Sequence, residues 1–505
     1  MVTTNYEMLF SSLVFLFYFL PLFLAAYFLI RPGFRNALLL FASAIFYVWG
    51  ESWFVLVMVA SILLDYVCAL WMVGGVSRRI PENGLKLSRH GSRNMSQKAA
   101  LLTSLCGNLG ILLFFKYFNF LVDSYNDIVG AIGMPSIGWE TDLVVSLPIG
   151  ISFFTFQSMS YTIDVYRGEV AATRSLLNFS TFVSMFPQLV AGPVVRYCDI
   201  EKHLANRGVS LARFAYGTRR FCTGLAKKVL IANTVAVPAD AIFSMPAEDL
   251  TLGLSWLGIA CYTLQIYFDF SGYSDMAIGL GQMTGFRFHE NFKHPYVSKS
   301  IREFWRRWHI SMSTWFRDYL YIPLGGNKRH ALVNLIIVFF LCGLWHGANY
   351  TFIVWGLFHG AFLVLERTRV GEIINRAWSP VRHVYVILVV MVGWVFFRAD
   401  SLSAAMEMLY AMAGYGTGSG VNRYVGEFIG TKLVVAMLAG CFFSLPVFGY
   451  VEKFHKRLTQ QESIGSRIAA RSAFVAYDIS LVVFLVISIM QLASGTHNPF
   501  IYFRF

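Results

Sequence analysis

The chain has 505 residues, of which 56% are hydrophobic, 17% aromatic and only 14% charged. A soluble globular domain has about 25% charged residues, so this composition excludes a soluble enzyme. The formal net charge is +13, but the basic residues gather between apolar runs. That pattern is typical of cytoplasmic loops that follow the positive-inside rule, rather than of nucleic-acid binding. Seven scattered cysteines without a CxxC pair predict neither a zinc site nor a disulfide framework.

Apolar runs suitable for membrane helices follow one another along the chain. The first is expected to be a retained helix, because it has no cleavage-site pattern. The basic loop at residues 76–98 is predicted to be cytoplasmic, which places the N-terminus outside. We expect about 11–12 transmembrane spans, at residues 9–30, 36–50, 52–74, 99–122 and 143–163, in a run ending near 237, and at 250–284, 331–347, 350–365, 383–397, 431–450 and 472–494.

The apolar stretch 175–195 contains Phe186-Pro-Gln-Leu-Val-Ala-Gly-Pro193 and has basic residues on both sides. Proline and glycine break a helix here, and like-charged flanks indicate that the chain enters and leaves the membrane on one face. We predict a re-entrant segment, since broken backbone at membrane depth is tolerated only where protein or a water-filled cavity satisfies it. No internal repeat or soluble domain is evident, so residues 1–505 are predicted to form one all-α, polytopic membrane domain that also has amphipathic helices.

The densest polar chemistry lies in residues 300–360, which we take as the catalytic segment. His309 stands in a stretch too charged to face lipid, whereas His346 ends an apolar run that should be in the membrane. A histidine within a membrane segment is costly and often functional, although a lone one can be structural. Imidazole has an ordinary pKa near 6.5, so a neutral buried histidine suits general base catalysis without a metal. We predict that this pair forms the active site.

Three arginines beside tryptophans in the same segment are candidates for binding an acyl donor: Arg302, Arg306 and Arg307. They could receive the phosphates of coenzyme A through charge-assisted hydrogen bonds. An interfacial amphipathic helix whose arginines reach lipid headgroups explains the same pattern at least as well. Both interpretations remain open.

Further polar residues are weaker candidates. Asp269 and Asp275 lie in the apolar run 250–284 and must point into the bundle, either to support the histidines or, more commonly, to pair helices. Asn349 follows His346 closely and is a candidate supporting group. His359 lies on the next apolar run and either lines the same cavity or is a satisfied core histidine.

Several motifs together resemble the membrane-bound O-acyltransferase (MBOAT) family, and most of all its bacterial alginate O-acetylation subgroup. The resemblance covers nearly the whole chain and reaches the terminal Phe500-Ile-Tyr-Phe-Arg-Phe505. In order, the motifs are Leu147-Pro-Ile-Gly-Ile-Ser-Phe-Phe-Thr-Phe-Gln157 with Asp164-Val-Tyr-Arg167, Phe186-Pro-Gln-Leu-Val-Ala-Gly-Pro193, Asp269-Phe-Ser-Gly-Tyr-Ser-Asp275, Glu303-Phe-Trp-Arg-Arg-Trp-His309-Ile-Ser311, Leu324-Gly-Gly-Asn327 and Gly343-Leu-Trp-His346-Gly347.

The resemblance implies a helical bundle around a central funnel, where a cytoplasmic acyl-thioester donor meets an extracytoplasmic acceptor. It implies that His346 takes the position of the family's near-universal histidine and His309 that of its second conserved polar residue. Which of them is the base stays open. The donor would be acetyl-CoA, used as a substrate with no bound cofactor or metal. The acceptors would be a periplasmic or membrane-anchored serine-type acetyltransferase and an exported, alginate-like polysaccharide at the bacterial inner membrane.

Other functions compete with this interpretation. A relative with another cargo could acetylate peptidoglycan or transfer D-alanine to teichoic acid. A non-enzymatic transporter is the remote alternative, but transporters often show internal repeats with paired broken helices, whereas this chain has one interrupted run. The sequence lacks a GxSxG nucleophile elbow. We therefore expect direct transfer rather than an acyl-enzyme intermediate.

Overall fold

The computed structural model describes residues 9–74, 85–134, 145–416, 418, 423–447, 464–495 and 497–501. Every regular element in these ranges is helical, and the only β contact there is an isolated bridge between Leu85 and Ala172. This confirms the predicted all-α class. The chain forms two compact units, one from residues 1–214 with 281–289 and the other from 215–280 with 290–505. The prediction of a single acyltransferase domain is not tested by this division.

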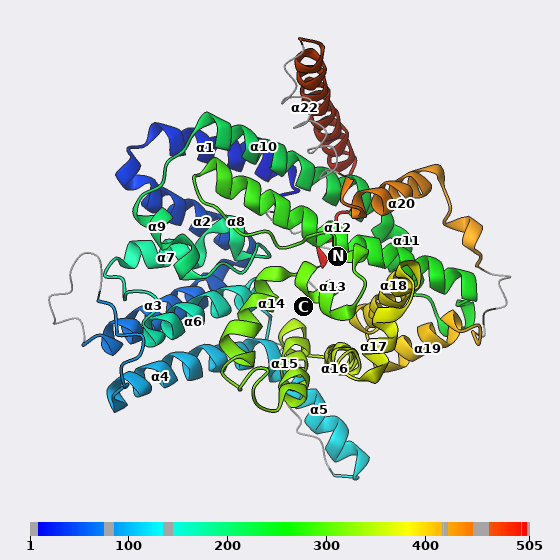
Figure 1. The fold of residues 1–505 in the computed structure, drawn as a ribbon, viewed down its shortest axis with the longest axis horizontal. Helices are drawn as coiled ribbons and strands as arrows, with labels where there is room; N and C mark the ends of the chain where they lie inside the picture. The colour runs from blue at the N-terminus through cyan, green and yellow to red at the C-terminus, as the bar shows by residue number, and fades with distance from the viewer. Residues whose placement is uncertain are drawn as a thin grey trace. The chain divides into compact units, whose positions relative to one another are not determined.

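The first unit places helices α3, α4 and α6 side by side (Figure 1). Asp65 on α3 lies between them and is fully buried. Its carboxylate accepts hydrogen bonds from Ser104 Oγ at 2.5 Å, from Asn108 Nδ2 at 2.8 Å and from Ser158 Oγ. The α-helices that lie wholly in the first unit, among the described residues, are α1 Leu20–Leu29, α2 Arg35–Glu51, α3 Val55–Met72, α4 Met95–Leu112, α5 Phe118–Ala131, α6 Ile151–Arg167, α7 Leu176–Ser184, α8 Phe186–Leu189 and α9 Tyr197–Ala205.

The predicted break in the stretch 175–195 is confirmed. Helix α7 ends at Ser184, and α8 begins at Phe186 after Met185 leaves the helical conformation with ψ 112°. Residues 190–196 are not helical. Whether this broken segment is re-entrant in a bilayer stays a prediction.

The second unit contains the predicted catalytic segment, residues 300–360. Its helices are α10 Leu211–Ala226, which begins in the first unit, α11 Asn233–Phe243, α12 Leu252–Met283, α13 Ile301–Arg307, α14 Ile310–Phe316, α15 Ala331–His346, α16 Tyr350–Leu365, α17 Arg369–Arg376, α18 Ser379–Arg398, α19 Leu402–Met412, α20 Thr431–Ser444 and α22 Ile464–Ala493. The bounds of α15 and α16 agree with the predicted apolar runs to within one residue.

Helices α15 and α16 pack tightly against each other (Figure 1). Gly343 on α15 faces the backbone of α16, and Gly356 on α16 faces the backbone of α15. A Cβ atom at either position would overlap a carbonyl oxygen, that of Phe352 or that of Phe339. The two glycines therefore allow the backbones to touch, and this close pair carries His346 at its end.

Four helical segments are long and apolar enough to cross a membrane within the described residues: Pro32–Met72, Met95–Ala131, Ser379–Arg398 and Ile468–Ala493. Shorter apolar helices add Phe15–Leu29, Ala331–His346, Tyr350–Leu365 and Thr431–Ser444. These helices fit a polytopic membrane protein, while the count of 11–12 spans stays a prediction. Parts of the predicted cytoplasmic loop 76–98, of the predicted spans 143–163 and 431–450 and of the terminal motif lie outside the described residues. These parts are residues 76–84, 143–144, 448–450 and 502–505.

Candidate active site

His346 is the last residue of α15 and is 4% exposed. Aromatic rings surround its imidazole. The ring centroids of Trp345, Trp355 and Phe397 lie 4.8, 5.0 and 5.1 Å from that of His346. These neighbours come from α15, α16 and α18, so the packing of three helices fixes the place of this side chain.

His309 lies in the turn between α13 and α14 and is completely buried. Its backbone has φ 44° in the left-handed region, which costs a non-glycine residue about 1 kcal/mol or more. Such strain often marks a functional position. Burial lowers the pKa of this imidazole to about 3, so the ring is neutral at physiological pH.

The tautomer of His309 follows from its neighbour Asn291. His309 Nδ1 lies 3.2 Å from Asn291 Oδ1. The same oxygen accepts hydrogen bonds from the Ser311 backbone N–H at 3.2 Å and from Ser311 Oγ at 2.9 Å. An atom that accepts from a backbone N–H must be the amide oxygen. Nδ1 therefore donates, and the neutral ring presents Nε2 as a hydrogen-bond acceptor.

One indole connects the two predicted histidines. The ring centroid of Trp345 lies 6.1 Å from that of His309 and 4.8 Å from that of His346. The structure thus brings together two residues 37 positions apart in the sequence. No group of three or more histidine, cysteine, aspartate or glutamate side chains in the described part of the chain could hold a metal ion.

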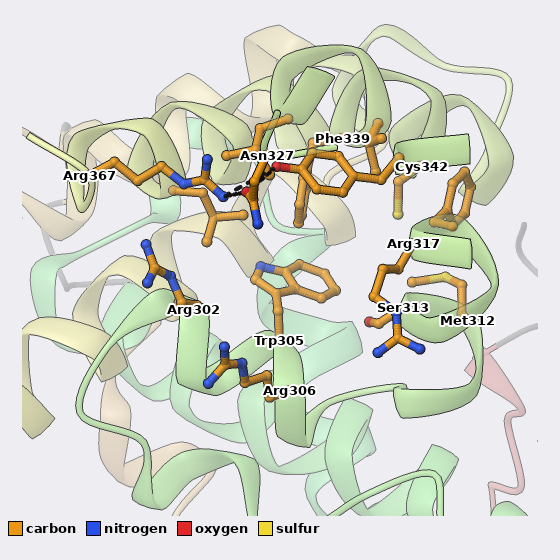
Figure 2. Close-up of a pocket in the computed structure, with 15 residues that line it drawn as sticks. Arg302, Trp305, Arg306, Met312, Ser313, Arg317, Asn327, Phe339, Cys342 and Arg367 are labelled. Carbon is orange, nitrogen blue, oxygen red and sulfur yellow. Dashed lines mark hydrogen bonds between the residues drawn. The ribbon is translucent and has the colours of Figure 1, made fainter. Parts of the chain in front are cut away.

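A cavity of about 300 Å³ lies between α13–α14 and α15 (Figure 2), and neither histidine is part of its lining. Its α15 wall is the apolar face Leu335, Val338, Phe339 and Cys342, and His346 is one turn beyond Cys342. Its other wall contains Trp305 and Met312. Polar and charged side chains complete it: Arg302, Arg306, Ser313, Arg317, Tyr321, Asn327 and Arg367.

The structure separates the three predicted arginines into two groups. Arg302 and Arg306 line the cavity, on the side of Trp305 away from Cys342 in Figure 2. No carboxylate among the described residues pairs with either guanidinium. Arg307 is not part of the lining and pairs with Glu303 at 2.8 Å. Spacing of four residues puts Arg302 and Arg306 on one face of α13, and Arg307 is turned away from it.

Sequence reasoning missed three residues of this site. Arg317 and Arg367 also line the cavity, and Arg367 donates to Asn327 Oδ1 at 3.1 Å. Glu366, at the end of α16, accepts hydrogen bonds from the backbone N–H groups of Ile301 at 2.6 Å and Arg302 at 3.1 Å. Its carboxylate therefore holds the first turn of the helix that carries the cavity arginines. A lone acid at the end of an apolar run was the only signal for it.

Asp269 and Asp275 both have basic partners. Asp275 on α12 pairs with Arg220 at 2.6 Å and Lys227 at 2.7 Å. Asp269 pairs with Lys228 at 2.7 Å, and both side chains are at most 2% exposed. These contacts fit helix pairing, the more common of the two roles expected for them.

The Asp269–Lys228 pair also holds the C-terminal segment. Asp269 Oδ2 accepts from the Ile501 backbone N–H at 2.8 Å, and Lys228 Nζ donates to the Pro499 carbonyl oxygen. Phe500 and Ile501 are each 4% exposed. The pair thus anchors the end of the described chain in the interior of the second unit.

Asn349 fixes the turn that follows His346. Its side-chain oxygen accepts from the Thr351 N–H at 3.0 Å and caps α16, while Nδ2 donates to the Asp400 carbonyl oxygen at 3.0 Å. His359 is buried on α16 but does not line the cavity. Neither of its ring nitrogens has a hydrogen-bond partner among the described residues. Neither expectation for His359, cavity lining or a satisfied core histidine, is confirmed.

The profile of the membrane-bound O-acyltransferase family matches residues 140–399, which include both histidines and the cavity. The chain belongs to this family. The probable alginate O-acetylase AlgI of Pseudomonas putida is 45% identical over 508 residues, covering 99% of this chain and 100% of that protein. AlgI of Azotobacter vinelandii is 43% identical over 525 residues, with the same coverage. The peptidoglycan O-acetyltransferase of Helicobacter pylori is 34% identical over 451 residues, covering 81% of this chain and 80% of that protein.

Proposed function

We propose that this MBOAT protein takes acetyl from cytoplasmic acetyl-CoA and delivers it across the bacterial inner membrane for O-acetylation of an exported, alginate-like polysaccharide. Similarity to alginate O-acetylases over the whole chain supports the acceptor class. A periplasmic or membrane-anchored partner with a serine nucleophile serves as the immediate acceptor. The relative that acetylates peptidoglycan matches less of the chain at lower identity, which makes peptidoglycan the second candidate.

The observation that supports this function best is the cavity lined by Arg302, Arg306 and the apolar face of α15. Arg302 and Arg306 supply positive charge without carboxylate partners in the described residues, as the phosphates of coenzyme A require. The apolar α15 wall continues from them and suits an uncharged pantetheine arm. Of the lining residues, Met312 lies three residues after His309 and Cys342 four before His346, about one helical turn along the chain from each histidine.

The transfer step then uses the histidines as follows. His346 takes the proton of the acceptor hydroxyl while the hydroxyl oxygen attacks the thioester carbonyl carbon. A C–O bond forms and the C–S bond breaks. The coenzyme A sulfur leaves as a thiolate, and His346 then donates the proton to it. His309 Nε2 accepts a hydrogen bond from a second N–H or O–H group of the acceptor and so orients the hydroxyl, because the single hydroxyl proton is donated to His346. This tautomer favours orientation over stabilisation of the oxyanion, which needs a donor.

The direct test is transfer of radiolabelled acetyl from acetyl-CoA in membranes that contain this protein and a candidate serine-type partner. We expect label on the partner and, when alginate is present, on the polysaccharide. Label on peptidoglycan alone would support the second candidate. If the protein uses no acetyl-CoA but accepts acyl groups from a carrier protein, the proposed donor is wrong.

Removing the cavity arginines should weaken donor binding. In Arg302→Gln and in Arg306→Gln, loss of one charge-assisted hydrogen bond, worth about 1.5–3 kcal/mol, should raise KM for acetyl-CoA at least about tenfold with little change in kcat. Initial rates over a range of acetyl-CoA concentrations measure both constants. Arg307→Gln, on the same helix but outside the cavity lining, is the matched control and should leave KM within about twofold. Equal effects at all three positions would contradict a cavity-specific role.

Glu366→Ala should have a smaller effect of the same kind. Loss of this capping carboxylate costs about 1 kcal/mol at the start of α13, so KM for acetyl-CoA should rise by about fivefold. Glu372→Ala, an exposed acid on the neighbouring α17, is the control. An unchanged KM in Glu366→Ala would show that α13 holds its arginines without this cap.

A further inference from the structure

His359 is an unusual residue for the interior in which it lies. It is completely buried on α16, and its ring centroid is 5.2 Å from that of Trp305 and 5.3 Å from that of Trp355. Neither Nδ1 nor Nε2 forms a hydrogen bond with any described residue. A buried polar group without a partner destabilises a fold, whereas an apolar ring of similar shape would not. Packing alone therefore does not explain a histidine here.

Gly393 on α18 leaves room for the His359 imidazole. An ideal Cβ atom at Gly393 would lie 2.7 Å from His359 Nε2. Any other residue at position 393 would push against this nitrogen, so glycine lets the backbone of α18 approach the ring edge. Contact with Gly393 thus holds Nε2 in place from one side.

The indole of Trp355 contacts two imidazoles, those of His346 and His359. Trp355 is one helical turn before His359 and is 1% exposed. Its ring meets His346 at 5.0 Å with an interplanar angle of 86°, and His359 at 5.3 Å with an angle of 74°. Edge-to-face contacts are directional, because the positive edge of one ring prefers the negative face of the other. A phenyl ring lacks the N–H group of imidazole, so it reproduces such a contact only in part.

We propose that His359 is a positioning residue for acyl transfer: held by Gly393, it fixes the Trp355 ring against His346 and thereby sets the orientation of the base. This inference rests on the role proposed for His346. His359 does not line the cavity itself, but its ring contacts Trp305, which does. A change in kcat with constant KM therefore distinguishes an effect on the chemical step from an effect on donor binding.

The test compares His359→Phe with wild type, using the full-length protein in detergent or nanodiscs. We expect kcat for acetyl transfer, per folded protein, to fall between about tenfold and 10²-fold, with KM for acetyl-CoA unchanged. His90→Phe, at an exposed position of the first unit, is the matched control. Retention of kcat in a folded His359→Phe protein would overturn the proposal, as would a fall in activity matched by an equal loss of folded protein.

A second measurement does not depend on activity. In protein with ¹³C-labelled histidines, the His346 resonance can be assigned from its loss in His346→Gln. Trp355→Phe should move this resonance by removing the indole ring current, and His359→Phe should move it in the same direction. Gly393→Ala, which crowds Nε2, provides another variant if His359→Phe fails to fold. An unmoved His346 resonance in a folded variant rejects the positioning role, whereas absent acetyl transfer by wild type rejects only the proposed donor or function.

Discussion

His346→Ala should lower acetyl transfer by about 10²–10⁴-fold, the usual contribution of a general base. The loss should appear in kcat, because the imidazole acts on the hydroxyl proton in the transition state and lies one turn beyond the cavity wall. Transfer of labelled acetyl from acetyl-CoA to the partner, measured at equal amounts of folded protein, gives the result. His90→Ala, which removes an exposed histidine, is the matched control.

Comparison with His309→Ala shows which of the two histidines is the base. His309→Ala removes an acceptor that orients the hydroxyl but leaves the base, so its loss of kcat should be smaller than that of His346→Ala. A reversed order would assign the base to His309, whose Nε2 is also an acceptor. Full transfer in both variants would remove this site from the mechanism.

Lys228→Met should be the most destabilising of the single changes considered. It leaves Asp269 buried without its cation, and breaking a buried ion pair from one side costs about 3–5 kcal/mol. It also removes the donor to the Pro499 carbonyl oxygen. We expect a lower free energy of unfolding in mixed detergent micelles and faster removal of C-terminal residues by carboxypeptidase.

Two further variants distinguish the contribution of the Lys228–Asp269 ion pair to stability from a general effect of removing a positive charge. Lys227→Met removes the adjacent lysine, but Asp275 keeps Arg220, so the loss should be smaller than that of Lys228→Met. Lys228→Met with Asp269→Leu removes both buried charges and should recover much of the stability lost in Lys228→Met. If Lys227→Met and Lys228→Met destabilise equally, the buried pair has no special role.

Local patterns were sufficient to predict the all-α class and the bounds of α15 and α16, and to select His309 and His346 as candidates. The apolar runs of α15 and α16 are continuous, so their ends were predicted to within one residue. The proline and glycine motif predicted the break near Met185, because proline fits the first turn of a helix, as Pro187 does in α8, but not the interior of a continuous one. The four-residue spacing of Arg302 and Arg306 also indicates that these two share one helix face, from which Arg307 is turned away.

The sequence by itself determined an all-α membrane protein of the MBOAT family with His309 and His346 as its candidate site, because hydrophobicity, helix breakers and motifs are properties of neighbouring residues. Only the tertiary structure decided that Trp345 joins the histidines, that Glu366 caps α13, and that His359 meets Gly393. The same holds for Lys228, Asp269 and the C-terminal segment, which come together across 232 residues between Asp269 and Ile501. Contacts between distant residues arise from packing and leave no periodic signal in one sequence.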